Sequence, residues 1–127
     1  MHYVIFSVEN DLHTRAKFLR YIDTQRAMGY LKGNMVMCIG AYKGVLEDSF
    51  ILCVEDFNNL VRGSSYLKGQ ESVLHVRGMR MHCEFEYLVS GIKESSGLLV
   101  QVTAQEAFKS DGWTYRPDMN TYWIIKE

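Results

Sequence analysis

Short apolar runs rich in β-branched and aromatic residues recur along the chain, and their order limits the possible fold more than any other feature. Runs of this kind predict β-strands. They lie at residues 2–8, 35–42, 49–55, 70–77 and 81–91. One helical pattern precedes the second run and another precedes the fourth. The order strand, helix, strand, strand, helix, strand follows for the first four runs.

The two helical patterns differ in quality. The first covers residues 12–22, where apolar side chains recur at helical spacing after a possible N-cap at Asn10 or Asp11. The second covers residues 55–69 and is expected to end at Gly69. An internal glycine and two serines weaken the second pattern, because these residues have low helix propensity.

Two βαβ halves of this kind usually form one antiparallel sheet with both helices on one face. We therefore predict an α+β fold of the ferredoxin-like βαββαβ type, followed by a C-terminal β extension. A chain of 127 residues fits one domain with one core. The predicted parts are a core at 1–90 and an extension at 91–127, the latter with a strand at 97–103, a helical turn at 103–108 and a last strand within 112–127.

In this topology three polar segments lie at the same rim of the sheet. They are residues 7–10, residues 42–47 and residues 70–72. The second and fourth strands are opposite edges of a four-stranded sheet, so their ends lie about 14 Å apart at the usual strand spacing. A neighbouring subunit could close a pocket that one protomer leaves open.

Composition excludes several kinds of partner. The chain has 14 basic and 15 acidic residues and a net charge of -1, which gives no electrostatic footprint for a nucleic-acid backbone. No apolar run approaches the roughly 20 residues that span a bilayer, and residues 1–10 lack the basic start of a signal peptide. Cys38, Cys53 and Cys83 have no metal-site spacing and fit a reducing compartment. We expect a cytoplasmic protein without a metal, nucleic-acid or membrane partner.

The hairpin at residues 40–50 carries the most specific candidate site. If residues 43–46 form a four-residue loop, Tyr42 and Glu47 face each other with their Cβ atoms about 5 Å apart. A ring face and a carboxylate stabilise an onium cation without needing its protons. Gly44 would let such a ligand approach the backbone closely. The alternative interpretation is a plain hairpin with a solvated glutamate.

Other polar and aromatic residues are open to two interpretations. Residues 70–72 can hydrogen-bond to a base or an amino-acid group, or they only connect a helix to a strand. Ser7 either joins the site or belongs to the cap of the first helix. The C-terminal aromatic residues form a small core over the sheet or, alternatively, a stacking platform for a base; they are Trp113, Tyr115, Tyr122 and Trp123.

Three motifs support a more specific interpretation. The first is the strand YVIFSVEN at residues 3–10, leading into a helix. The second is the Gly-x-Tyr of residues 40–42, followed after a hairpin by the acidic pair 47–48. The third is QESVL at residues 70–74, which is similar to a Q-[acid]-x-V-L pattern. In this order, over residues 3–78, the motifs resemble the small bacteriophage S-adenosylmethionine (SAM) lyases, also called SAM hydrolases, and related phage proteins.

The resemblance implies a ferredoxin-like homotrimer that holds SAM between subunits. It implies cleavage to 5'-methylthioadenosine and L-homoserine lactone by attack of the substrate's own carboxylate, without a cofactor. By position, Glu47 would be the essential catalytic carboxylate of the site, Tyr42 would lie near the sulfonium, and Gln70 would hydrogen-bond the ligand. The other candidate substrate-binding residues are Ser7, Gly44 and Ser49.

Three functions stay open at this point. The first is an anti-restriction enzyme that removes the methyl donor in the host cytoplasm during phage infection. The second is a non-catalytic binder of SAM or a nucleotide. The third is an inhibitor that contacts a host protein through the aromatic segment 113–123. The loop between Tyr42 and Glu47 is shorter here than in the family, which leaves open whether SAM is cleaved or only bound.

Overall fold

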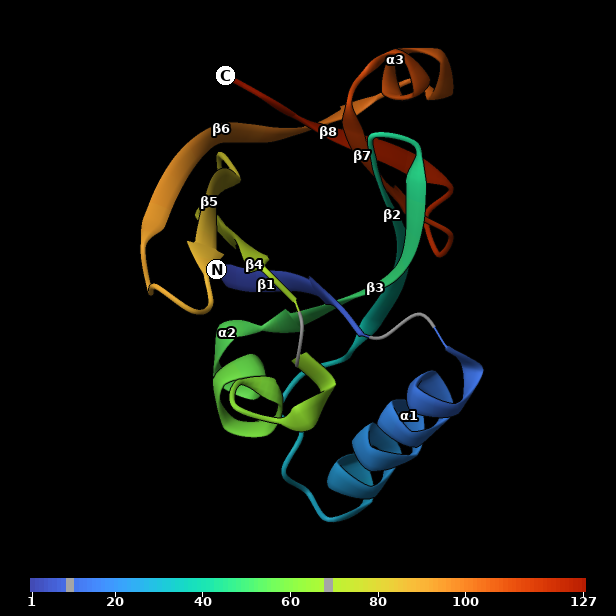
Figure 1. Cartoon of the computed structure of the whole chain (residues 1–127), viewed down its shortest axis with the longest axis vertical. Helices are drawn as coiled ribbons and strands as arrows, with labels where there is room; N and C mark the ends of the chain where they lie inside the picture. The colour runs from blue at the N-terminus through green and yellow to red at the C-terminus, as the bar shows by residue number, and fades with distance from the viewer. Residues whose placement is uncertain (9–10, 68–69) are drawn as a thin grey trace.

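A computed structural model describes residues 1–8, 11–67 and 70–127. The strands form a closed antiparallel barrel in the order β1-β3-β2-β7-β8-β6-β5-β4 (Figure 1). The strands are β1 (His2–Ser7), β2 (Val36–Tyr42), β3 (Val45–Cys53), β4 (Ser72–Arg77), β5 (His82–Tyr87), β6 (Lys93–Val102), β7 (Gly112–Arg116) and β8 (Thr121–Lys126). The helical segments are α1 (Leu12–Ala27), α2 (Val54–Asp56), η1 (Phe57–Val61), η2 (Ser65–Leu67) and α3 (Ala104–Lys109).

The ferredoxin-like prediction is wrong, because the sheet does not end at β2 and β4. The first four strands pair antiparallel in the order β4-β1-β3-β2. Beyond them, β7 pairs with β2 and β5 pairs with β4. Strands β6 and β8 complete the ring. The backbone groups that would otherwise be free at the two sheet edges are therefore satisfied by β5 at the β4 edge and by β7, a strand of the predicted extension 91–127, at the β2 edge.

Two further element predictions need correction. The predicted second helix is split into α2, η1 and η2, with Gly63 at φ +79 between η1 and η2. Its predicted end at Gly69 lies outside the described residues. The predicted last strand is a hairpin of β7 and β8, since Pro117 has no N–H for the ladder and Asn120 takes φ +53 in the turn.

Helix α1 begins as predicted at Asp11, whose Oδ1 accepts a hydrogen bond from the Thr14 N–H at 2.8 Å. The other candidate cap, Asn10, lies outside the described residues. The buried face of α1 consists of Phe18 and Ile22. In the described part of the chain, no helix is long and apolar enough to cross a membrane.

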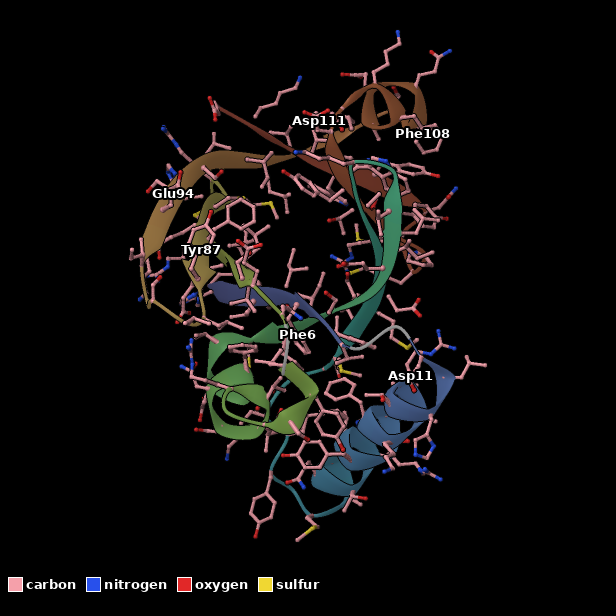
Figure 2. All side chains as sticks on the ribbon, viewed as in Figure 1. Phe6, Asp11, Tyr87, Glu94, Phe108 and Asp111 are labelled. Carbon is pink, nitrogen blue, oxygen red and sulfur yellow. The ribbon has the colours of Figure 1, made fainter. Side chains whose placement is uncertain are left out.

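The core lies between the barrel and the helical segments α1 to η2, which share one side of the barrel (Figures 1 and 2). Phe6 of β1 is opposite Phe50 of β3, and both rings contact Phe18 of α1. Strand residues alternate between the two faces of a sheet. Ser7 and its partner Ser49 therefore point to the other face, into the barrel.

A buried polar chain crosses the helix side of the sheet. Arg62 donates two hydrogen bonds to Glu86, at 2.6 and 2.8 Å. The other side of Glu86 meets Nε2 of His75 at 2.7 Å, and Nδ1 of His75 lies 2.7 Å from Nε2 of His2. These contacts tie β1, β4, β5 and the end of η1 together. Glu86 and His75 are 7% and 2% exposed, so the charge of Glu86 is retained only because it is paired.

Candidate functional site

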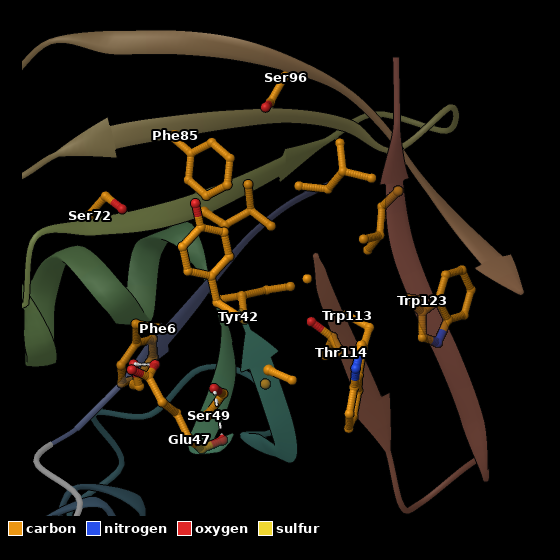
Figure 3. Close-up of a pocket in the computed structure, with 18 of the residues that line it drawn as sticks. Phe6, Tyr42, Glu47, Ser49, Ser72, Phe85, Ser96, Trp113, Thr114 and Trp123 are labelled. Carbon is orange, nitrogen blue, oxygen red and sulfur yellow. Dashed lines mark hydrogen bonds between the residues drawn. The ribbon is translucent and has the colours of Figure 1, made fainter. Parts of the chain in front are cut away.

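The barrel contains an open cavity of about 1040 Å³ (Figure 3). All eight strands contribute to its lining. Small-molecule sites in proteins commonly occupy about 300–1,000 Å³ and combine apolar walls with a few polar groups. The cavity is therefore large enough to hold a ligand of nucleoside size or more.

The hairpin that opens into this cavity is tighter than predicted. Tyr42 pairs with Val45, so the loop has two residues, Lys43 and Gly44, and not four. Their φ values of 49 and 82 are those of a type I′ turn. The predicted direct opposition of Tyr42 and Glu47 is therefore wrong.

Tyr42 and Glu47 nevertheless share the inner face of the hairpin. Glu47 is opposite Gly40, and Gly40 is two residues from Tyr42 on the same strand. Residues two apart lie on the same face, so the ring and the carboxylate form a diagonal pair. Both line the cavity, where the Tyr42 ring stands towards Phe85 (Figure 3).

Gly40 makes this arrangement possible. A Cβ at position 40 would lie 2.9 Å from Ser49 Oγ, a distance that real Cβ contacts essentially never show. Ser49 is buried, and its hydroxyl contacts the Glu47 carbonyl at 3.5 Å. The glycine of the Gly-x-Tyr motif therefore leaves the space into which Ser49 fits beside Glu47.

The Glu47 carboxylate is held from β1. Ser7 Oγ donates a hydrogen bond to Glu47 Oε2 at 2.9 Å. The neighbouring acid points to the opposite face, where Asp48 Oδ2 is 2.5 Å from Arg15 of α1. Of the acidic pair in the sequence motif, only Glu47 faces the cavity, and Asp48 binds the helix.

Gln70 also contacts Ser7, through both ends of its amide. The Ser7 N–H donates to Gln70 Oε1 at 3.2 Å, and Gln70 Nε2 donates to the Ser7 carbonyl. Ser7, Glu47 and Gln70 come from segments far apart in the sequence, and the structure brings them together at one end of the cavity.

The predicted site residues can now be placed. Those that line the cavity are Ser7, Tyr42, Glu47, Ser49 and Gln70. Gly44 is not among the lining residues, and its positive φ serves the turn. Their predicted roles towards a ligand stay predictions.

Some lining residues escaped the sequence interpretation. Asp111 lies beside the hairpin because its carbonyl accepts a hydrogen bond from the Lys43 N–H at 2.7 Å. Ser96 occupies an irregularity between β5 and β6 and points toward the cavity (Figure 3). Neither position carries a local signal beyond a turn or a serine-rich strand, because the pairing of distant strands places them. Trp113 and Trp123, expected mainly as a small core, also line the cavity.

The cavity lining is acidic and aromatic. Its carboxylates belong to Glu47, Glu71, Asp111 and Glu127. Among the lining residues that the structure describes there is no lysine, arginine or histidine. Several aromatic rings join them, including Tyr42 and Tyr87. Carboxylates and ring faces both attract a cation, so the cavity is suited to a positively charged ligand.

The raised pKa of Tyr87 is consistent with a negative potential on this wall of the barrel. The pKa of Tyr87 is raised, first by the charge of Glu94, whose Oε2 lies 3.4 Å from the phenol oxygen (Figure 2). Glu71 and Tyr42 contribute to the same shift. At neutral pH Tyr87 is therefore an uncharged hydroxyl at the edge of an acidic cavity.

None of the three cysteines is among the residues that line the cavity. All three are free, and burial raises the pKa of Cys38 to about 12 and that of Cys83 to about 11. A thiol attacks as the thiolate, which such values keep scarce at neutral pH. Within residues 1–8, 11–67 and 70–127, no group of three or more His, Cys, Asp or Glu side chains is placed to hold a metal ion.

Comparison with known proteins gives one family. The model of the S-Adenosylmethionine lyase family matches residues 7–126. No curated protein matches the chain. The match includes β2 to β8 and, of β1, only its last residue, Ser7.

Proposed function

Since the chain belongs to the S-adenosylmethionine lyase family, we propose that it cleaves SAM to 5'-methylthioadenosine and L-homoserine lactone in the barrel cavity. The observation that carries this proposal is the diagonal pair of Tyr42 and Glu47 in a cavity whose described lining has carboxylates but no basic residue. SAM carries a sulfonium and an ammonium, and both charges favour such surroundings.

In the reaction the SAM carboxylate attacks its own γ-carbon. The new C–O bond closes the lactone ring while the C–S bond breaks, and its electron pair stays on sulfur as a neutral thioether. No proton needs to move in this step. Catalysis therefore consists mainly of holding the methionine part in a folded attack conformation.

The acidic lining fits this chemistry. A lysine or arginine near the SAM carboxylate would hold it in an extended position by an ion pair. The described lining residues include no such partner, so none of them holds the carboxylate away from the γ-carbon by an ion pair. Glu47 would bind the ammonium or face the sulfonium, and Tyr42 would offer its ring to the sulfonium.

The decisive test incubates the purified chain with SAM and follows the products by liquid chromatography. We expect methylthioadenosine to form, and Glu47→Gln to lower the rate by about 100-fold or more, as loss of a charged group that positions the reacting atoms does. Glu55→Gln is the matched control, since Glu55 is exposed and outside the cavity lining. An unchanged SAM peak with the wild-type chain would exclude the proposed reaction.

A non-catalytic SAM binder is the second candidate. The observation that favours it is the two-residue hairpin loop, which is shorter than the loop in the family. Calorimetry separates the cases. SAM should bind about tenfold more tightly than S-adenosylhomocysteine, a neutral thioether of nearly the same shape, because the cavity attracts the sulfonium charge. Binding with this preference but without products would support the binder. Equal affinities would contradict the role assigned to Tyr42 and Glu47.

Two broader features belong to the same proposal. A phage protein with this activity would act in the host cytoplasm and deplete the methyl donor of restriction–modification systems. Expression in a restricting bacterial strain should then raise the plating efficiency of an unmodified phage, and Glu47→Gln should not. A homotrimer is also proposed, and light scattering would measure it. Ser7 contacts both Glu47 and Gln70 within one chain, so assembly is not needed to join these three residues.

A further inference from the structure

We infer that Gln70 is a positioning residue, which acts on Glu47 through Ser7 and does not bind the ligand itself. This inference rests on the proposed function for its kinetic consequences, but its structural part can be tested without SAM. It changes the role that the resemblance implied, in which Gln70 hydrogen-bonds the ligand.

The first observation is where the β1–β4 ladder stops. Pairing runs from His2 opposite Arg77 to Ile5 opposite Leu74, and no pair beyond Ile5 joins these strands. Ser7 is the last residue of β1, two positions further. The strands separate here, and Ser7, Gln70 and Ser72 all line the cavity.

The second observation is that the Gln70 side chain hydrogen-bonds to the backbone of Ser7, beyond the end of the β1–β4 ladder. Its amide accepts from the Ser7 N–H at 3.2 Å and donates to the Ser7 carbonyl. Two residues in a hydrogen-bonded antiparallel pair exchange bonds in the same way. The side chain thus replaces the missing backbone partner and holds the peptide groups on both sides of Ser7.

Holding the backbone of Ser7 fixes the direction of its side chain. The hydroxyl donates to Glu47 Oε2 at 2.9 Å. Among the described residues, Ser7 is the only donor to the Glu47 carboxylate. Glu47 is an exposed side chain, and such a side chain loses considerable rotamer freedom when it is held in one geometry. Gln70 therefore contributes to catalysis by keeping the carboxylate in place before the substrate arrives.

The third observation argues against a direct ligand contact. A glutamine amide has two N–H donors and an oxygen with two acceptor sites, and Ser7 engages one donor and one acceptor site. A ligand that used the donor and acceptor directed at Ser7 would have to break these bonds, and any other ligand would be limited to the remaining N–H and lone pair. The chain of contacts from Gln70 to Ser7 to Glu47 needs no such rearrangement.

The test is a double-mutant cycle of Gln70→Met and Ser7→Ala on the full chain, with two measurements. Methionine has nearly the size of glutamine but makes neither hydrogen bond. Gln101→Met is the matched control, since Gln101 is exposed and outside the cavity lining. Gln70→Asn is a second Gln70 variant, because its shorter amide cannot reach both backbone groups of Ser7 while it keeps a polar side chain at the rim.

The first measurement is the carbon-13 NMR resonance of the Glu47 side-chain carboxyl, without ligand. Gln70→Met and Gln70→Asn should displace this resonance in the same direction as Ser7→Ala does. The double variant should show no larger displacement than Ser7→Ala alone. Gln101→Met should leave the resonance unchanged. A Glu47 resonance that stays in place when Gln70 is replaced would overturn the inference. This result does not depend on whether SAM is cleaved.

The second measurement is SAM turnover. Gln70→Met should lower kcat about tenfold, the effect of losing one positioning hydrogen bond, and change KM by less than about twofold. In the Ser7→Ala background the same substitution should cost less than about twofold, because the two residues act on one target. A raised KM with unchanged kcat, or a full additional tenfold loss in that background, would identify a direct ligand contact and overturn the inference. Absence of turnover in the wild-type chain would defeat the proposed function and leave the NMR result to decide the inference.

Discussion

At the scale of single residues, the site depends on the space beside Gly40 and on the face of the strand to which each acidic side chain points. Gly40 carries no side chain, and Ser49 occupies the space that a Cβ would need. Glu47 and Asp48 are neighbours in sequence but face opposite sides, one into the cavity and one towards Arg15. The alternation of a strand thus separates a candidate catalytic carboxylate from a structural one.

Gly40→Ala tests this residue-scale packing. The added methyl group would meet Ser49 Oγ at 2.9 Å, so we expect the free energy of unfolding to fall by about 1–3 kcal/mol, as overpacking usually costs. Ser49→Ala in the same chain removes the hydroxyl and should restore most of the loss. Urea denaturation of both variants measures this. A double variant no more stable than Gly40→Ala would show that another contact excludes the side chain.

At the scale of elements, the β2–β3 hairpin sets the geometry of the candidate site. Its two-residue turn places Glu47 opposite Gly40, and a four-residue loop would have placed Glu47 opposite Tyr42. The shift in pairing is two residues, and because the side-chain period of a strand is two, both side chains stay on the inner face. Tyr42 and Glu47 are therefore neighbours on the inner face, as predicted, although their predicted register is wrong.

Gly44→Ala tests whether Gly44 serves the turn or the ligand. Alanine at φ +82 should cost about 1–2 kcal/mol of stability. The affinity for SAM should stay unchanged, since Gly44 does not line the cavity. Lys43→Asn is the control that should raise the stability, because asparagine tolerates the left-handed conformation that Lys43 adopts at φ 49. Denaturation measures the stability and calorimetry measures the affinity for SAM. A loss of affinity with Gly44→Ala would show that Gly44 belongs to the binding site.

At the scale of the whole molecule, two separate interiors share one sheet. The helix side of β1, β3 and β4 is packed with apolar side chains and one buried polar chain. The barrel side encloses the cavity. A largely apolar core therefore supports a polar cavity on the other face of the same strands, and the stability of the molecule and the chemistry of the site can be tested separately.

The pH dependence of stability tests the polar chain of the packed side. Burial, followed by the charge of Arg77, lowers the pKa of His2 from 6.5 to about 4. The hydrogen bond from Arg62 is the main cause that lowers the pKa of Glu86 from 4.5 to about 2. The unfolded chain therefore binds more protons than the folded chain between pH 6.5 and 4 at His2, and between pH 4.5 and 2 at Glu86.

The free energy of unfolding should accordingly fall as the pH is lowered through both windows. Urea denaturation across this range measures the slope. His2→Gln should flatten the upper window, and Glu86→Gln should flatten the lower one at a cost in stability near neutral pH. A slope between pH 6.5 and 4 that is the same in the wild type and in His2→Gln would contradict the assignment to His2.

Local sequence determined much of this protein. The strand and helix patterns of residues 2–53 follow from apolar periodicity and from a cap at Asp11, and the two-residue period of a strand puts Tyr42 and Glu47 on one face of their hairpin. Only the tertiary structure decided that β7 joins β2, that the barrel closes, and that Asp111 and Ser96 line its cavity. The physical reason is that edge pairing joins backbone groups distant in sequence. Any edge strand offers the same N–H and C=O groups, so which edges meet depends on the packing of the whole chain.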